Sequence, residues 1–324
     1  MKRKIMLILF VSVLAAVLAA CGGNEETGGE SSGGDEGSKD GQLVFGYTSM
    51  TQNNPFFIAL EKSIREEVEA NGDKLITMNP AMDVALQINQ IEDLIAQDID
   101  AIFLNPVDWE GIRPALEMLE KAEIPIINYD TEVKDFEYVT AYVGSDNKNA
   151  GFVAGQDLVA KYPDGGKIAV LDSPTMNSIN DRIAGFMEAI EGKGFDIVAQ
   201  QDAKGDLETA LGITEDILQA HPDIIAIMGG NDPTALGALA AAKAANKSDL
   251  AIYGVDGSPD AKAAIADGGA FVGTGAQSPI SIGKQSADVA YQILNGEDFE
   301  ERIPVETFLI NKDNVEEYGV DGWQ

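Results

Sequence analysis

The feature that most constrains the fold is a repeated alternation of short, almost wholly apolar runs with segments of helical spacing. Apolar residues of 57–68, 85–96, 206–220, 232–245 and 280–294 recur at the spacing of one helix face, and Asn71-Gly72 is a typical helix stop. Apolar strands separated by helices are typical of parallel sheets covered on both faces, and ten strands are many for one open sheet. We therefore predict an α/β chain with two sheets. The ten runs are 43–48, 74–78, 101–104, 125–129, 139–143, 167–171, 197–200, 224–228, 250–254 and 271–275.

Two stretches of the chain, 93–108 and 216–232, resemble each other in sequence. Each is followed by a helical segment and then by an apolar run that ends in an aspartate, Asp130 or Asp256. Two matches in the same order indicate a duplication and predict two related lobes.

The N-terminus has the layout of a secretory signal peptide, which we assign to residues 1–20. A basic start at 2–4 precedes an apolar run over 5–20, which is shorter than the roughly 20 residues of a membrane-spanning helix. The run ends in Leu-Ala-Ala-Cys21, which resembles a bacterial lipobox, in which the cysteine is lipidated and becomes the new N-terminus. The alternative is an ordinary signal peptide with a chance cysteine.

Residues 21–41 are expected to form the lipidated Cys21 and a flexible tether rich in Gly and acidic residues. A flexible chain of this length spans roughly 25 Å. We expect a protein anchored by lipid at the outer face of the cell membrane, extracellular or periplasmic, with a Gram-positive type of envelope preferred.

Charge and residue counts exclude several classes of function. The chain has 22 Lys and Arg against 54 Asp and Glu, a net charge of −32, whereas nucleic-acid binding needs a basic surface. The single Cys excludes an intramolecular disulfide or a multi-cysteine metal site. The single histidine, His221, precedes an apolar run and is interpreted as structural. We expect that the protein is not an enzyme and that it has no cofactor, no bound metal and no nucleic-acid partner.

Polar and aromatic residues follow several of the apolar runs, where ligands bind in open α/β sheets. Carboxylates, amides and a guanidinium have planar hydrogen-bonding ends, and a phenyl ring offers a flat face to C–H groups. This combination predicts a small ligand rich in hydroxyl groups, namely a sugar. The candidate residues are Asn54, Phe56, Phe57, Asp130, Arg182, Asn231, Asp256 and Gln277.

Each candidate also has a purely structural interpretation. Asn54 is equally suited to capping a helix, and Asp232, which precedes a proline, is interpreted as a helix N-cap. Phe57 suits the core, Arg182 a solvated helix start, and Asp256 a plain turn. Periodicity alone leaves these alternatives open.

Four segments together resemble the ribose-type periplasmic sugar-binding proteins. They are Asn-Asn-Pro-Phe-Phe at 53–57 and the stretches 231–239, 253–260 and 275–279, and the resemblance extends over 43–310. The family supplies the extracellular receptors of ATP-driven (ABC) sugar importers, which deliver sugar to a membrane permease. Its fold, the type I periplasmic binding protein fold, has two Rossmann-like lobes joined by three crossovers, with the sugar between them.

The resemblance implies lobe one over 42–145 plus 278–305, lobe two over 146–277 plus 306–324, and a monomer. It assigns the sugar contacts to the eight candidates above. Two positions depart from the family pattern: Thr131 stands where ribose receptors have an arginine, and Gly205 where the family often has an aromatic ring. Trp109 and Met176 are candidates to compensate. Ribose is the leading ligand, with another pentose, a hexose or a cyclic polyol as alternatives.

The implied mechanism is closure of the two lobes on the sugar. One alternative is a sugar or polyol chemosensor that signals without transport. The other is a glycosidase that uses Asp130 and Asp256 as paired carboxylates, although 1–324 contains no common hydrolase or phosphate-binding motif.

Overall fold

The computed structural model describes residues 41–324. The predicted signal peptide, Cys21 and nearly all of the predicted tether lie outside these residues. In chain order the elements are β1 (Val44–Thr48), α1 (Pro55–Ala70), β2 (Lys74–Met78), α2 (Val84–Ile95), β3 (Ala101–Leu104), α3 (Arg113–Lys121), β4 (Ile126–Tyr129), η1 (Phe136–Tyr138), β5 (Ala141–Ser145), α4 (Asn147–Lys161), β6 (Gly166–Asp172), α5 (Asn177–Ile190), β7 (Phe195–Asp202), α6 (Leu207–Ala220), β8 (Ala226–Gly229), α7 (Asp232–Ala244), β9 (Ala251–Asp256), α8 (Pro259–Asp267), β10 (Phe271–Ala276), α9 (Pro279–Asn295), β11 (Arg302–Val305), β12 (Phe308–Asn311) and α10 (Val315–Tyr318).

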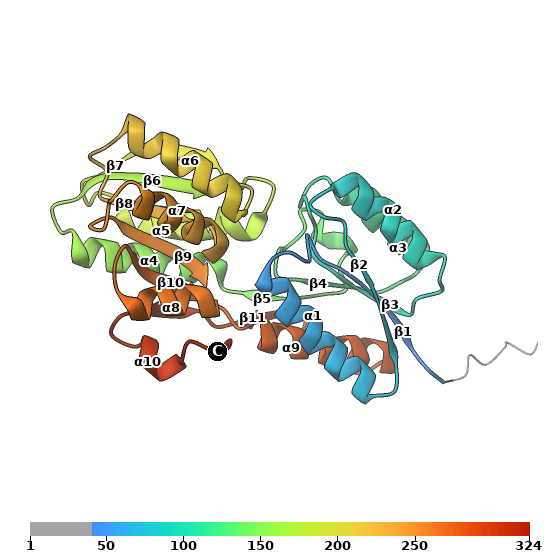
Figure 1. Ribbon diagram of the computed structural model, residues 1–324. Coiled ribbons are helices and arrows are strands. Elements are labelled where there is room, and N and C mark those ends of the chain that lie inside the picture. Colours follow the sequence, from blue (N-terminus) through green and yellow to red (C-terminus); the bar gives the residue numbers. More distant parts are fainter. Residues whose placement is uncertain (1–40) are drawn as a thin grey trace, which may run out of the picture. The chain divides into compact units, whose positions relative to one another are not determined.

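The strands form two six-stranded sheets with the same order (Figure 1). The first runs β11-β5-β4-β3-β1-β2 and the second β12-β10-β9-β8-β6-β7. All pairs are parallel except β10 with β12, which is antiparallel. The predicted α/β class with two parallel sheets is confirmed. The resembling stretches 93–108 and 216–232 contain β3 and β8, which hold equivalent places in the two sheets.

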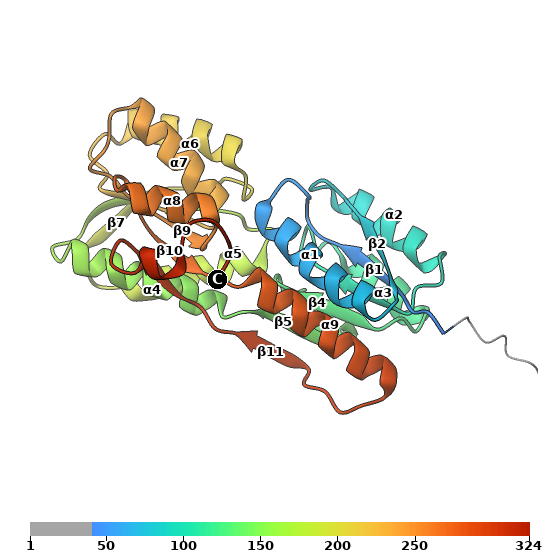
Figure 2. The same cartoon turned by 60° about the horizontal axis from the view of Figure 1, so that its bottom comes forward.

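Helices cover both faces of each sheet and define two lobes. In the first lobe, α1 packs beside α9 on one face, and α2 lies with α3 on the other (Figures 1 and 2). In the second lobe, α4 packs on α5 and α6 packs on α7, while α8 lies against β10 and α10. Fully buried apolar side chains such as Phe45, Phe103 and Ile227 fill the layers between sheets and helices. None of the helices that the structure describes is long and apolar enough to cross a membrane.

The chain passes between the lobes three times. It leaves the first sheet after β5 for α4, returns from β10 to α9, and leaves again between β11 and β12. The predicted three crossovers are therefore confirmed. Strand β4 is parallel to β5, and β9 is parallel to β10, so β4 and β9 end at the sheet edges from which the chain crosses between the lobes.

The five predicted helices are confirmed to within two residues at each end, and α1 ends at Ala70 with Asn71 as its C-cap. All ten predicted strands are present, the largest shift being that of β5. The apolar patterning did not predict the short strands β11 and β12 or the helices α3, α4, α5, α8 and α10. In α4 the buried face carries Ala150, Gly151, Ala154 and Gly155, and Leu158 is the one bulky apolar residue among its buried side chains, so the apolar pattern that marks a helix in sequence is weak.

Candidate functional site

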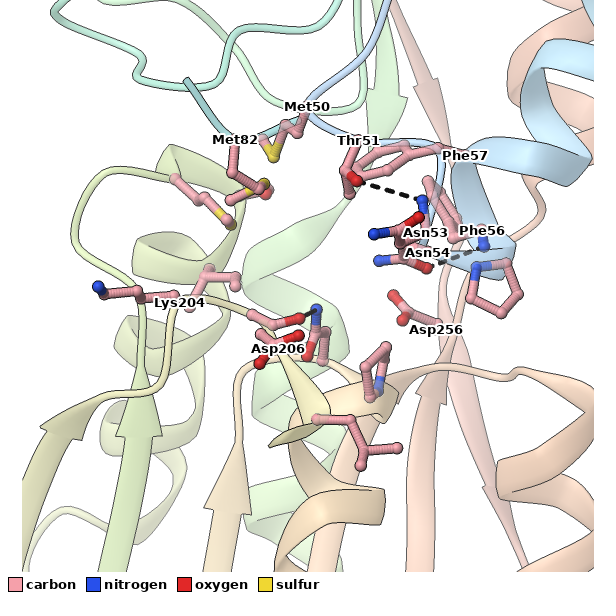
Figure 3. Close-up of a pocket in the computed structure, with 18 of the residues that line it drawn as sticks. Met50, Thr51, Asn53, Asn54, Phe56, Phe57, Met82, Lys204, Asp206 and Asp256 are labelled. Atoms are coloured by element: carbon pink, nitrogen blue, oxygen red, sulfur yellow. Dashed lines mark hydrogen bonds between the residues drawn. The ribbon is translucent and has the colours of Figure 1, made fainter. Parts of the chain in front are cut away.

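A cavity of about 320 Å³ lies between the lobes and is lined by residues of both. This volume is at the lower end of the range of about 300–1,000 Å³ for small-molecule sites. Figure 3 shows Asn54, Phe56 and Phe57 at the start of α1, opposite Asp256, with Met50 and Met82 together at another side. Seven of the eight predicted residues line the cavity: Asn54, Phe56, Phe57, Asp130, Arg182, Asn231 and Asp256.

Arg182 is the cation at the centre of the site. It lies on α5, is only 3 % exposed, and has Nη1 3.6 Å from Asp256 Oδ1 and Nη2 3.9 Å from Asp130 Oδ1. Its Nε donates to Asn147 Oδ1 at 2.8 Å and its Nη1 to the carbonyl of Gly230 at 3.1 Å. These bonds fix the guanidinium plane, so the interpretation of Arg182 as a solvated helix-start residue is wrong.

Asp130 brings a carboxylate to the cavity from the first lobe. It directly follows β4 and has φ +58°, a conformation that aspartate tolerates better than most residues. Asn105 Nδ2 donates to its Oδ2 at 3.0 Å, whereas its buried Oδ1 has no hydrogen-bond partner in the part of the chain that the structure describes. Burial raises the pKa of Asp130, and Arg182 partly opposes this. Asp130 therefore has a carboxylate oxygen available to accept from a ligand.

Asp256 brings the second carboxylate, from the end of β9. Its Oδ1 accepts from Gln277 Nε2 at 2.8 Å and its Oδ2 from the backbone N–H of Asp232 at 3.3 Å. Burial raises the pKa of Asp256 well above its usual value; Arg182 lowers it, and the nearby carboxylates of Asp232 and Asp130 raise it. Gln277 does not line the cavity and instead orients Asp256 from behind.

Asn231, and not Asp232, caps α7. Asn231 Oδ1 accepts from Thr234 N at 3.0 Å, and its Nδ2 donates to the carbonyl of Gly205 at 3.0 Å. Asp232 is the first residue of the helix and is fully buried, with its carboxylate accepting from Ser258 N and Thr274 Oγ1, each at 2.7 Å. The interpretation of Asp232 as the N-cap is wrong because Asn231 occupies that position and Asp232 ties α7 to β10 and α8.

The start of α1 supplies an amide and two rings. Asn54 caps the helix by accepting from Phe56 N at 2.9 Å, which confirms its capping interpretation, and it also lines the cavity. Phe56 and Phe57 pack edge to face with ring centroids 5.6 Å apart. They are 2 % and 6 % exposed and belong to the core while lining the cavity. The site thus has a polar part with fixed hydrogen-bonding groups and an aromatic wall.

Some lining residues were not predicted, and His221 lies elsewhere. Met50 follows β1, so the same strand-end rule that selected the other candidates would have found it. Lys204 and Asp206 come from the loop between β7 and α6, and the same rule would have selected them because this loop follows a strand. His221 is the C-cap of α6, before β8, and is not among the lining residues. Within 41–324 no group of three His, Cys, Asp or Glu side chains is arranged to hold a metal ion.

Comparison with known families gives a match that spans most of the chain. Residues 45–298 match the periplasmic binding protein domain. The chain belongs to this family. Among curated relatives, the ribose import binding protein of Bacillus subtilis (strain 168) is 34 % identical over 304 residues, covering 94 % of this chain and 97 % of that protein. The ribose import binding protein of Salmonella typhimurium is 32 % identical over 263 residues, covering 81 % and 88 %.

Solved structures of periplasmic binding proteins share the fold. An ABC transporter solute binding protein from Mycobacterium smegmatis with bound glycerol has a TM-score of 0.83 at 33 % identity, covering 87 % of this chain and 99 % of that one. One from Bacillus halodurans with bound myo-inositol has a TM-score of 0.81 at 29 % identity, with the same coverage. The type I periplasmic binding protein fold is thereby confirmed.

Thr131 and Gly205, the two positions expected to depart from the ribose-type pattern, lie beside the boundary between the lobes. Thr131 is buried, and its Oγ1 lies 2.7 Å from Ser178 Oγ of the second lobe. At Gly205, a Cβ atom would lie 3.4 Å from Sδ and Cε of Met176, which lines the cavity. Met176 therefore fills space beside this glycine. Trp109 is not among the lining residues; its backbone N–H donates to the carbonyl of Thr175 at 3.1 Å.

Proposed function

We propose that this chain captures a monosaccharide or a cyclic polyol between its lobes and delivers it to the permease of an ABC importer. The observation that carries the proposal is the buried Arg182 between Asp130 of the first lobe and Asp256 of the second. Neighbouring hydroxyl groups on a ring suit such alternating acceptors and donors. Curated relatives named for ribose import, and solved neighbours that hold glycerol, myo-inositol and D-allose, support this class of ligand.

We assign a role to each site residue. Asp130 and Asp256 accept hydrogen bonds from ligand hydroxyls, and Arg182 donates to them. Asn54 and Asn231 add amide contacts, and Phe56 and Phe57 stack on the C–H face of the ring. Gln277 acts through Asp256, to which it donates.

Capture proceeds by closure of the lobes about the three crossovers. The lobes are proposed to comprise 42–145 plus 278–305 and 146–277 plus 306–324. A ligand that contacts both lobes binds the closed form better than the open form and so shifts the population towards closure. Release to the permease then requires reopening.

A lipid anchor would keep the binding protein at the outer face of the membrane. Its proposed parts are the signal peptide 1–20, the lipidated Cys21 and the tether up to residue 41, which carry a monomeric body outside the cytoplasm. The sequence Leu-Ala-Ala-Cys supports this assignment. Metabolic labelling with radioactive palmitate should mark the membrane fraction of the wild type, while Cys21→Ser should be unlabelled and released into the medium. A labelled Cys21→Ser protein would contradict the anchor.

The function is tested by a thermal-shift screen of the purified body over pentoses, hexoses and cyclic polyols. Any ligand that binds the native state raises the unfolding temperature, and at 100 times its Kd it adds about 2.7 kcal/mol to stability. We expect at least one sugar or polyol to raise Tm and to titrate with one site per chain by calorimetry. If no member of the three classes shifts Tm at millimolar concentration, the proposed ligand class is wrong.

A further inference from the structure

The last residues of the chain, 319–324, form a segment that we call the strap. It follows α10, which packs against α8 of the second lobe (Figure 2). The ammonium of Lys262, a fully buried residue, donates to the carbonyl of Gly322 at 2.6 Å. The amide of Gln324 donates to the carbonyl of Asp256 at 3.1 Å and to that of Gln277. The strap is therefore fixed to the second lobe and to two residues of the candidate site.

Gly257 provides the space for this arrangement. Its φ is +75°, and a Cβ atom there would overlap the amide nitrogen of Gln324. A side chain at 257 would be strained by the backbone and would also displace the strap. The turn after β9 thus accommodates the strap directly behind Asp256.

Trp323 is the strap residue that reaches the first lobe. Its ring packs edge to face on Phe56, with centroids 5.8 Å apart and an interplanar angle of 77°. Phe56 lies in the first turn of α1, is 2 % exposed, and lines the cavity, whereas Trp323 does not line it. The indole therefore supports the aromatic wall of the site from behind, and from the opposite lobe.

We propose that Trp323 is a positioning residue for ligand capture, which holds Phe56 in place when the lobes are closed. The proposal deepens the function above and depends on its closure step. When the lobes separate, Phe56 moves with the first lobe and Trp323 with the second, so their contact favours the closed form with or without ligand. A contact that favours only the closed form slows the release of every ligand by the same factor.

The test compares three variants, using D-ribose and myo-inositol as probes in stopped-flow and calorimetric measurements. Trp323→Ala should raise koff and Kd by about 2- to 10-fold, the range expected for one aromatic pair. The ratio of the two Kd values should stay constant, and Trp323→Phe should retain most of the wild-type affinity. The matched control is Tyr318→Ala, because Tyr318 stacks on Phe308 within the second lobe with centroids 4.9 Å apart. It should lower Tm and leave koff unchanged.

A measurement without ligand separates this inference from the proposed function. Spin labels on Glu92→Cys of α2 and Glu215→Cys of α6, both exposed positions, report the distance between the lobes in a Cys21→Ser background. Trp323→Ala should shift the ligand-free distribution to longer distances, and Tyr318→Ala should not. Identical distributions for wild type and Trp323→Ala would overturn the inference, whichever sugars bind. A shifted distribution together with no binding of any sugar in the panel would overturn the ligand class alone.

Discussion

Arg182 Nη2 lies 3.9 Å from Asp130 Oδ1 across the boundary between the two lobes. On the other side of the guanidinium, Nη1 lies 3.6 Å from Asp256 Oδ1. All three side chains are at most 5 % exposed, so each charge depends on the others for compensation. One buried cation thus couples the carboxylates of both lobes.

Replacing Arg182 should weaken ligand binding strongly. Arg182→Ala removes a charged donor and leaves Asp130 and Asp256 without their cation, so we expect a loss of about 1.5–3 kcal/mol in binding free energy, or roughly 10- to 150-fold in Kd. The affinity of Arg182→Lys should lie between those of the wild type and Arg182→Ala, because lysine keeps the charge but lacks the planar guanidinium. Calorimetry with the best ligand of the thermal-shift screen measures both. Unchanged affinity in Arg182→Ala would refute the assignment of the site.

The raised pKa of Asp256 predicts a specific pH dependence of stability. Because burial raises the pKa of Asp256 in the folded state, the folded protein holds this proton at pH values where the unfolded chain releases it. The contribution of Asp256 to stability is full below the pKa of about 3.9 that an aspartate has in the unfolded chain. It is lost as pH rises through the raised pKa of the folded state. Asp256→Asn has no such titration.

Both proteins are measured without ligand. As pH rises from 4, the Tm of the wild type should therefore fall relative to that of Asp256→Asn, so the Tm of the variant minus that of the wild type should increase. Calorimetric scans at several pH values in one buffer strength measure it. The general repulsion among the many surface carboxylates acts on both proteins and cancels in the difference. A difference that is constant with pH would show that Asp256 keeps its usual pKa.

Asn105 should be needed to keep the Asp130 carboxylate ionised and in position to bind the ligand. Asn105 is fully buried, and its amide donates to Asp130 Oδ2 at 3.0 Å, a bond that lowers the pKa of Asp130. Asn105→Ala should weaken binding by about 10-fold, the effect of losing one hydrogen bond to a charged group. Asn105→Asp should bind the ligand more weakly than Asn105→Ala at pH 7, because it places a second carboxylate beside Asp130. Its affinity should partly recover at lower pH. Equal affinity of Asn105→Asp at pH 7 and at the lower pH would contradict this role.

The central strands of the sheets could be predicted from the sequence because they are apolar and buried on both faces. The apolar runs of β3, β4, β8 and β9 could be recognised as strands without reference to their neighbours. Asp130 and Asp256 were then predicted as site residues because they stand at the ends of such runs. Capping was harder to predict: two adjacent residues, Asn231 and Asp232, are both good N-caps. Asn231 caps α7, whereas the carboxylate of Asp232 accepts hydrogen bonds from Ser258 and Thr274, which are distant in sequence.

Contacts between distant segments could not be predicted in this way. The packing of Trp323 on Phe56 joins residues from the two ends of the described chain, and no local pattern indicates it. The same holds for β11 and β12, whose short segments become strands only because they pair with β5 and β10. Helix α4 was missed because its buried face is made mostly of small residues, which let α5 approach closely.

That close approach leads to a last prediction, which links helix packing to the site. A Cβ atom on Gly151 of α4 would overlap the backbone carbonyl of Arg182 on α5. Gly151→Ala should therefore push the helices apart, cost about 1–3 kcal/mol of unfolding free energy, and displace Arg182 from Asp130 and Asp256, so that affinity falls together with stability. The matched control is Gly212→Ala in α6, where a Cβ atom meets nothing within 4 Å. Gly212→Ala should raise stability by about 0.5–1 kcal/mol, because alanine is the better helix former, and leave Kd unchanged. Denaturant unfolding and calorimetry on both variants give the two quantities, and a Gly151→Ala protein as stable as Gly212→Ala would show that α4 and α5 do not pack this closely.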